Sequence, residues 1–536
     1  MRLTGYFIIL IGLAGIHLSC TNRESAVEKA TKNKILLFGN QTEPQDLDPH
    51  IVTGVPEFQI IESLLEGLTI LDPQNLSPLP ATASSWEISD NGLVYTFNIR
   101  KNAKWSNGDP VKASDFVFSF QRILSPALGS EYAYMLYCIK NAREFNKSQI
   151  DDFSEVGVKA VGDSILQIEL CKPVPYFLSL IAHHSWYPVH PPTILRFGSI
   201  DTRGSKWTRP ENFVGNGPFI LDSWDINKII IVKKSGTYYD NESVSLNGIN
   251  FYPIENNLTE ERSFRTGQLH ITSSCPLNKI RWYRSNQPQN LRVDPYLGTY
   301  YYLVNVNNKP LDNKNVRKAL ALAIDREALT EHVLEGGQLP AASFTPPNVA
   351  GYTYGNALSF DTTEARKLLE EAGYDKNNPF PPVSLLYNTH ESHHTIAQAI
   401  QQMWKIYLGI DITLINQEWK VYLETTQNHK YDLARMGWIS DYNDPNSFLD
   451  LWITDGGNNR TGWSNLTYDS LVHAASLISD KEERFRLFSE AERILLDELP
   501  VLPIYFYTNV YLIHSSVMGW TPNILNNHNY KFIDLE

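Results

Sequence analysis

The spacing of apolar residues changes near residue 300, and this change constrains the possible folds more than any other feature of the sequence. Before it, short alternating apolar runs are frequent, as at 86–89 and 93–99, which flank the turn Asp90-Asn91-Gly92. This arrangement predicts a β-hairpin, because Asn and Gly tolerate the positive φ angles of a tight turn. After it, apolar periods of strand type and helix type alternate, which is typical of an α/β layer.

The elements expected from these periods can be placed along the chain. In the first half we expect a strand over 35–38 and a helix over 115–123 that begins at Ser114 or Asp115. In the second half we expect helices over 315–334 and 362–372 and one ending near Gly409, with strands over 383–387, 412–415 and 433–438. A β-rich part followed by an α/β part predicts at least two lobes, and lobed proteins place ligands in the cleft between domains.

Length and charge exclude several classes of protein. The 536 residues suffice for about three to four units of domain size. The net charge of −13 argues against a nucleic-acid binder, because such proteins neutralise phosphate with Lys and Arg. The hydrophobic fraction of 42% is ordinary for a globular chain and excludes a protein with many membrane spans.

The N-terminus carries an export signal. A positive start at Arg2 precedes an apolar run from Tyr6 to Leu18, which is too short to span a bilayer. Ser19-Cys20 then resembles a bacterial lipobox, although His17 stands where Leu is usual. We expect a lipoprotein signal peptide over 1–20, lipidation of Cys20 and a tether over 21–33; ordinary secretion with a chance cysteine is the alternative.

Three further cysteines, Cys138, Cys171 and Cys275, form no C-x-x-C pair, so the sequence offers no zinc ribbon and no thioredoxin motif. In an oxidising compartment Cys138 and Cys171 are the most plausible pair for a disulfide. Three buried thiols are an equal alternative.

His390-Glu391-Ser392-His393-His394 matches H-E-x-x-H, the signature of zinc peptidases. The motif directly follows a predicted strand, so it falls in the first turn of a helix, and no distinctive third-ligand pattern follows, although Glu418 is available. Neither G-x-S-x-G nor a phosphate-binding loop is present. We therefore expect no enzymatic activity and no cofactor, and keep a zinc peptidase as an alternative.

The residues and the order of several short segments resemble those of one known family. The segments lie at 42–50 with 54–57, 64–68, 104–110, 214–219, 294–302, 385–389, 416–420 and 434–445. This family is the periplasmic oligopeptide-binding proteins, the extracytoplasmic receptors of ABC peptide importers (bacterial extracellular solute-binding protein family 5). The resemblance runs from about residue 34 to the C-terminus.

The resemblance implies an α/β fold of the type II periplasmic-binding-protein class, with two lobes, a hinge and an inserted small domain. Lobe I would comprise 34–65, 192–297 and 509–536, the inserted domain II 66–191, and lobe III 298–508. The lobes would close on an extended peptide, whose main chain pairs with strands in the cleft.

The resemblance also implies binding residues. Asp441 matches the family's ammonium-binding Asp, and a buried ammonium needs such a carboxylate. The backbone groups of Val55, Gly437 and Ile439 match positions that pair with the peptide main chain. Side chains that match the cleft wall or carboxylate-binding positions are those of Tyr132, Trp419, Trp438, Tyr507, His393 and Arg435.

The chain departs from the best-studied branch of the family at several positions. Thr426 stands where Arg can occur, and Thr53 and Leu303 stand where that branch has acidic side chains. These exchanges predict a changed preference for peptide length or charge. Gly298 and Ile439 occupy positions that form a disulfide in some relatives, so that bridge is impossible here.

The expected function is a monomeric receptor in the periplasm or another extracytoplasmic location. Its partners would be short peptides and ABC permease subunits, with membrane contact through a lipid anchor only and no nucleic acid. A receptor for murein-derived peptides is the alternative within the same fold, prompted by Thr53, Leu303 and Thr426. A nickel- or haem-binding member of the superfamily is a weaker option.

Overall fold

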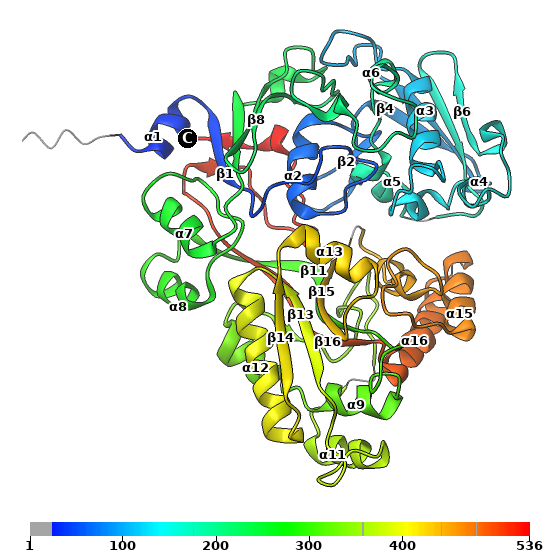
Figure 1. The fold of residues 1–536 in the computed structure, drawn as a ribbon. Helices are drawn as coiled ribbons and strands as arrows, with labels where there is room; N and C mark the ends of the chain where they lie inside the picture. The colour runs from blue at the N-terminus through cyan, green and yellow to red at the C-terminus, as the bar shows by residue number, and fades with distance from the viewer. Residues whose placement is uncertain (1–23, 175, 356–357, 441, 479) are drawn as a thin grey trace, which may run out of the picture.

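The computed structural model describes residues 24–174, 176–355, 358–440, 442–478 and 480–536. Two bodies stand one above the other, and the upper one extends sideways (Figure 1). Two four-stranded sheets form the upper body, and one six-stranded sheet between helices forms the lower body.

The first sheet joins distant parts of the chain. Its order is β1-β10-β9-β8, with bounds β1 (Ile35–Gly39), β8 (Phe219–Asp225), β9 (Ile229–Lys234) and β10 (Gly248–Tyr252). β1 lies parallel to β10, with Ile35 opposite Gly248. The end of the chain adds the short pair β17 (Val517–Met518) and β18 (Asp534–Leu535), and Leu535 is buried in the same core as Leu36. This part of the upper body therefore needs residues from both ends of the chain.

The second sheet is antiparallel, in the order β4-β5-β7-β6. Its strands are β4 (Ala83–Ile88), β5 (Val94–Ile99), β6 (Val158–Val161) and β7 (Ile165–Glu169). β4 and β5 form the predicted hairpin, with Ile88 opposite Tyr95 and Gly92 at a φ of +68°. A two-stranded ribbon, β2 (Thr69–Leu71) with β3 (Pro78–Pro80), precedes this sheet.

Helix α3 (Ala113–Leu124) packs against this second sheet and begins earlier than predicted. Lys112, not Ser114 or Asp115, is its N-cap residue. The Asp115 carboxylate accepts hydrogen bonds from the Lys112 backbone N–H and the Trp105 indole N–H, both at 3.0 Å. Asp115 therefore stabilises the first turn from inside the helix.

The six-stranded sheet has the order β12-β16-β11-β15-β13-β14. Its strands are β11 (Leu291–Val304), β12 (Leu339–Pro340), β13 (Val383–Asn388), β14 (Ile412–Gln417), β15 (Leu433–Ile439) and β16 (Val501–Leu512). Successive residues of β11 enter different cores: Tyr300 and Tyr302 one, Tyr301 and Leu303 the other. Because side chains alternate across a strand, this sheet is covered on both faces.

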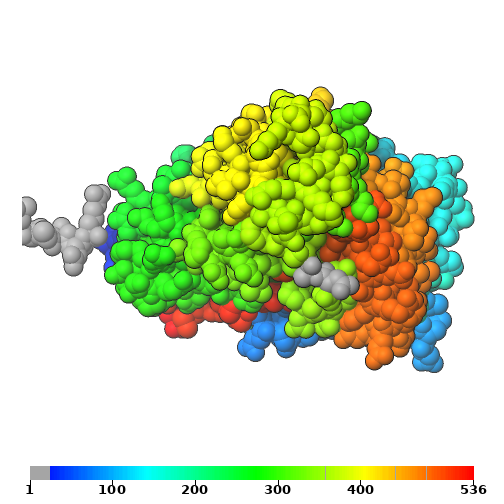
Figure 2. Space-filling view, turned by 90° about the horizontal axis from the view of Figure 1, so that it is seen from below, coloured from blue at the N-terminus to red at the C-terminus, as the bar shows by residue number. Residues whose placement is uncertain are grey.

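Helices form the two covering layers. One layer contains α9 (Lys314–Leu322), α11 (Thr362–Glu371) and α12 (Glu391–Leu408); the other contains α13 (Trp419–Gln427), α14 (Asn446–Leu449), α15 (Leu466–Leu477) and α16 (Lys481–Glu498). Seen from below, the yellow α12 side and the orange α15–α16 side flank the lower body (Figure 2). Asp361 caps α11. As predicted, α12 ends at Gly409, whose φ is +72°.

Strands β11 and β16 connect the two bodies. The start of β11 pairs with the end of β16 (Leu291 with Leu512), beside the core of the upper body, while Leu303 pairs with Val501 in the lower body. The register shifts between Pro295 and Thr299, where the paired strands pass from one body to the other. The remaining helices of the upper body include α2 (Val55–Leu64), α4 (Ala142–Asn146), α5 (Phe177–Leu180), α6 (Pro191–Arg196), α7 (Asn257–Arg265) and α8 (Leu277–Asn286).

Two predicted segments differ from the structure. Residues 26–32 of the predicted tether form helix α1 (Ala26–Lys32), which a reciprocal Ser25–Glu28 capping box starts and whose Val27 and Ala30 are buried. The predicted helix over 315–334 is broken into α9, α10 (Arg326–Leu329) and a π-helical turn, because Asp325 accepts a hydrogen bond from the Ala328 N–H and starts a new helix.

The three described cysteines are free thiols. Cys138 and Cys171 lie on neighbouring segments, since the Cys171 N–H donates to the Cys138 carbonyl at 2.8 Å. Cys171 is exposed and Cys275 is buried, so the alternative of three buried thiols does not describe the chain. Within the described ranges, which exclude residues 1–23, none of the helices has the length and hydropathy to cross a membrane.

Candidate functional site

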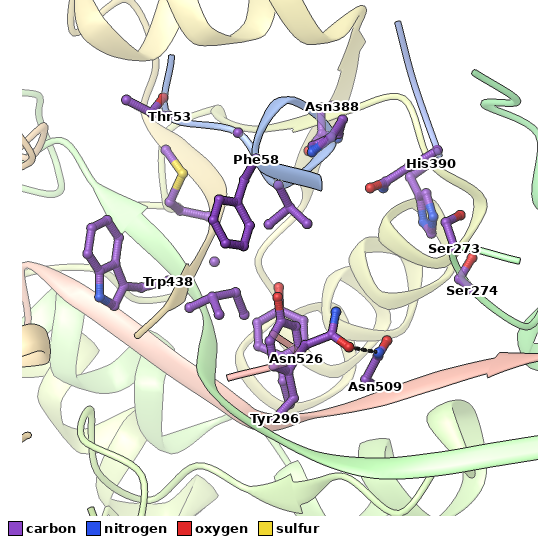
Figure 3. Close-up of a pocket in the computed structure, with 18 of the residues that line it drawn as sticks. Thr53, Phe58, Ser273, Ser274, Tyr296, Asn388, His390, Trp438, Asn509 and Asn526 are labelled. Carbon is purple, nitrogen blue, oxygen red and sulfur yellow. Dashed lines mark hydrogen bonds between the residues drawn. The ribbon is translucent and has the colours of Figure 1, made fainter. Parts of the chain in front are cut away.

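A cavity of about 480 Å³ lies where the two bodies meet. Its volume is within the range of small-ligand pockets. Its wall includes residues from the start of α2, the loops around 132 and 183, strand β15 and the middle of β16. The close-up shows Phe58, Tyr296 and Trp438 reaching the same space from α2, β11 and β15 (Figure 3).

One edge of β15 is open at this cavity. On one side β15 pairs with β11 along its whole length, whereas β13 pairs only with Leu433 and Ala434. The Ser440 N–H donates to Leu297 O at 2.8 Å, toward β11. Because backbone groups alternate in direction along an antiparallel strand, the N–H and C=O groups of Gly437 and Ile439 point to the opposite edge. Among the described residues, no strand pairs with that edge.

Arg435 stands beside this edge as a half-buried cation. Its guanidinium donates to Tyr507 Oη at 2.8 Å and to Asn388 Oδ1 at 3.2 Å, and lies 4.8 Å from the centre of the Tyr300 ring. Tyr422 Oη donates to the Arg435 carbonyl. These contacts fix the guanidinium at the cavity wall with neutral partners, which leaves its charge available to an anionic group.

Two histidines adjoin this cation. His390 and His393 both line the cavity, with ring centres 4.7 Å apart. Burial, and secondarily the charge of Arg435, lowers the pKa of His390 to about 4 and that of His393 well below its usual value. Both imidazoles are therefore neutral at neutral pH and present polar rather than charged groups.

Aromatic rings cover the remaining wall. Trp438, on β15, lies in the cavity opposite Phe58 (Figure 3). Trp419 begins α13 and stacks on Tyr422 with a centroid distance of 5.8 Å. Tyr132 packs edge-on against His183 at 4.9 Å. Such rings provide apolar contact area that tolerates different side chains.

The start of α2 lies in the wall of the cavity. Gly54 is its N-cap residue, without a side-chain hydrogen bond, and Val55 opens the helix with 37% of its surface exposed. The first N–H groups of a helix have no intrahelical partner. Behind them, the buried Glu57 carboxylate accepts from the Gln45 N–H at 2.7 Å, and burial raises its pKa.

The cavity brings together nearly all residues that the resemblance singled out. Its wall contains every predicted binding residue that the structure describes, namely Val55, Tyr132, His393, Trp419, Arg435, Gly437, Trp438, Ile439 and Tyr507. Asp441 and Cys20 lie outside the described residues. The structure shows that these residues lie together, and the role of each residue in binding stays a prediction.

The positions that depart from the family also lie at or near this site. Thr53 and Leu303 line the cavity. Thr426 is buried, and the guanidinium of Arg460 donates to its hydroxyl at 3.0 Å. A cation therefore stands beside position 426 although that residue is Thr. Gly298 and Ile439 lie directly opposite each other on β11 and β15.

Sequence patterns gave no indication of Arg460, Glu131, His183 or His184, all of which line the cavity. Arg460 and Glu131 occupy loops, carry no motif and are separated by 329 residues. Of these four residues, only His183 and His184, which are adjacent in sequence, form a local pattern that could have indicated a functional site.

The H-E-x-x-H motif does not form a ligand set. His390 is the N-cap of α12, with extended backbone, so it precedes the helix that carries His394. His394 Nδ1 lies 2.7 Å from Tyr387 Oη and faces away from the cavity lining that includes His390. Within the described part of the chain, no group of three or more His, Cys, Asp or Glu side chains is arranged to hold a metal.

Comparison with known proteins identifies the family. The model for the middle part of the bacterial extracellular solute-binding proteins, family 5, matches residues 77–460, which is more than half of the chain. The chain belongs to this family. The family 5 chain is 37% identical to the periplasmic oligopeptide-binding protein OppA of Salmonella typhimurium over 512 residues, covering 93% of this chain and 91% of that protein.

Solved structures agree on the fold of this family 5 protein. OppA of Haemophilus influenzae in complex with RPPGFSPFR superposes with a TM-score of 0.89 at 35% identity, covering 94% of this chain and 99% of that one. The match confirms the predicted α/β fold of the type II periplasmic-binding-protein class.

Two structures of one relative indicate the state of the cleft. The murein tripeptide-binding protein MppA of Escherichia coli, 34% identical and covering 94% of this chain and 99% of that one, gives a TM-score of 0.89. Its unliganded open form gives 0.66 at the same identity, covering 94% of this chain and 98% of that one. The bodies of the family 5 chain are therefore arranged differently from that open form.

Proposed function

We propose that this family 5 protein is an extracytoplasmic receptor that captures short peptides in the cavity between its two bodies and delivers them to an ABC importer. The unpaired edge of β15 carries the proposal. An extended peptide has N–H and C=O groups that need partners when buried, and Gly437 and Ile439 offer both at an edge where no described strand competes.

The ends of the peptide require charged partners. Asp441 directly follows the open edge in sequence, and we assign it to the α-ammonium group. Arg435 is a half-buried cation of the cavity wall, and we assign it to the α-carboxylate, directly or through water. The aromatic wall would accept side chains of different size, so affinity would depend on the main chain more than on sequence.

The same proposal includes how the chain is organised. Lobe I would comprise 34–65, 192–297 and 509–536, domain II 66–191 and lobe III 298–508, with β11 and β16 at the hinge. Cys20 would carry the lipid anchor, and the chain would act as a monomer. The tether would end at residue 24 or 25, because α1 is docked on the upper body.

Calorimetry tests the proposal with three matched ligands: trialanine, N-acetyl-trialanine and trialanine amide. We expect trialanine to bind and N-acetylation to weaken binding by several kcal/mol, because it removes the ammonium group from a buried carboxylate. Asp441→Ala should weaken binding of trialanine but change that of the acetylated peptide little. Peptides of two to five residues that fail to bind at all would contradict the proposal.

Murein-derived peptides are the second candidate ligands. Thr53 and Leu303 line the cavity without the acidic side chains that the oligopeptide branch has there, and one structural neighbour is a murein tripeptide-binding protein. Competition between trialanine and a diaminopimelate-containing tripeptide distinguishes the two. Stronger binding of the diaminopimelate peptide favours this candidate, and equal or weaker binding rejects it.

A further inference from the structure

The carboxylate of Glu131 connects the two bodies at the cavity. Glu131 lies between α3 and the 3₁₀ turn Ala133–Leu136, beside the β4-β5-β7-β6 sheet. Its carboxylate accepts from Gln427 Nε2 at 2.7 Å and from Arg460 Nη2 at 3.2 Å. Gln427 ends α13, and Arg460 follows η7 (Asp450–Trp452), so both donors belong to the lower body.

Arg460 is held in place for this contact. Its side chain is 10% exposed, its other terminal nitrogen donates to Thr426 Oγ1 at 3.0 Å, and its carbonyl accepts from Tyr431 Oη. Glu131 is 27% exposed and lines the cavity as well. The ion pair therefore stands at the rim, between the cavity and the solvent.

A second contact joins the same bodies. Tyr176 stacks on Tyr442 with ring centres 4.8 Å apart and planes 8° apart. Arg484 lies 5.6 Å from the Tyr176 ring and forms a bidentate pair with Asp444, with both distances 2.6 Å. Tyr442 and Asp444 lie in the segment that connects β15 to α14. Lys172, which follows β7, also donates to Ser476 Oγ on α15. The part of the upper body around the second sheet thus contacts the lower body through several side chains.

These contacts exist only while the bodies are close. Separation would expose the Glu131 carboxylate to water and leave Arg460 with Thr426 alone. Because the pair is partly exposed, its net contribution is modest. Charge pairs that are broken as a complex opens act mainly on the dissociation rate.

We propose that Glu131 and Arg460 form a clasp that holds the cleft closed around a bound ligand, with Glu131 as a positioning residue that need not touch the ligand. This inference rests on the proposed function and deepens it, since it assigns the region around residues 131–176 to closure. Ligand release must break the clasp, so its loss shortens the lifetime of the complex.

A double-mutant cycle tests the clasp in the full-length chain. The probe is tetra-alanine, and stopped-flow tryptophan fluorescence gives its rate constants for the wild type, Glu131→Ala, Arg460→Gln and the double variant. We expect each single variant to raise the dissociation rate three- to tenfold and change the association rate less than twofold. The double variant should equal a single one, because each exchange breaks the same interaction. Glu87→Gln, an exposed residue on β4, is the matched charge control.

Two outcomes would overturn the clasp. One is a dissociation rate within twofold of the wild type for Glu131→Ala. The other is a loss of thermal stability in ligand-free Glu131→Ala that is as large as the loss in the ligand-bound variant, which would mark the contact as structural in every state. A wild-type chain that binds no peptide would overturn the proposed function instead. Small-angle scattering then tests the clasp without a peptide: we expect the same radius of gyration for the ligand-free wild type and ligand-free Glu131→Ala, because the open chain has no clasp to lose. A larger radius for the variant would show that the contact forms without a ligand and would reject the clasp.

Discussion

The guanidinium of Arg435 on β15 donates a 2.8 Å hydrogen bond to the hydroxyl of Tyr507 on β16, across the intervening strand β11. On β11 itself, the Tyr300 ring lies 4.8 Å from the same guanidinium. Among the described residues no carboxylate pairs with Arg435. The site thus keeps a half-buried cation whose partners are neutral, which costs stability and favours an anionic ligand.

Replacing this cation should separate binding from stability. We expect Arg435→Met to weaken binding of trialanine at least tenfold. The free energy of unfolding of the ligand-free chain should fall by less than about 1 kcal/mol or rise, because removing a half-buried charge that has no charged partner is often neutral or stabilising. Calorimetry and urea denaturation measure the two quantities. Arg435→Lys and trialanine amide are the controls. A loss of several kcal/mol of stability with unchanged affinity would contradict this role.

The space beside Gly437 gives a second prediction. A Cβ at this position would collide with the Tyr507 hydroxyl and lie 3.3 Å from Arg435 Nη2. We expect Gly437→Ala to displace both side chains and reduce peptide affinity about tenfold, while the backbone of an extended strand accepts Ala readily. Gly457→Ala is the control, since nothing lies within 4 Å of its Cβ. Calorimetry that shows the same affinity for both variants would reject the prediction.

Low pH should lower the free energy of unfolding through His390. Burial lowers its pKa to about 4 in the folded state, whereas an unfolded His titrates near 6.5. Between these values the unfolded state binds more protons, so this residue makes the free energy of unfolding fall as the pH drops from about 6.5 to about 4. We expect His390→Gln to gain stability relative to the wild type across that window. Denaturant unfolding at pH 7, 6 and 5 measures the difference, and a constant difference would contradict the cause.

The docking of α1 predicts where truncation becomes harmful. Val27 and Ala30 are buried against the core that contains Leu37 and Leu512. Removal of residues 1–23 should leave the melting temperature nearly unchanged, whereas removal of 1–33 should lower it by several degrees, because it exposes this core. Ser25→Ala should cost about 1 kcal/mol through the lost cap. Equal melting temperatures for the two truncations would show that α1 contributes nothing.

Local patterns predicted the elements whose signals are local. The hairpin of β4 and β5, the parallel strands β13 and β14, and the ends of α11 and α12 follow from alternation, caps and glycines. The single helix expected over 315–334 was wrong because the Asp325 cap competes with an uninterrupted apolar period. The capping box of Ser25 and Glu28 was a visible signal for α1, but it lay in a segment interpreted as a tether.

The candidate functional site is formed by contacts between distant parts of the chain, and no local sequence pattern contains these contacts. The open edge of β15 exists because the pairing between β13 and β15 ends at Leu386 and Ala434, which only the assembled sheet determines. The positions of Gly437, Arg435 and Trp438 were found through the family resemblance. Arg460 beside Thr426 was missed, because the resemblance concerns matching positions and this cation comes from another segment.

Native mass spectrometry tests the central claim most directly. The refolded, ligand-free chain is mixed with an equimolar library of peptides of two to eight residues and then separated from unbound material. The account predicts a series of complexes with one peptide each, confined to short lengths, and the loss of this series when the library is N-acetylated. A spectrum that shows only the bare chain, or equal retention of acetylated peptides, would contradict it.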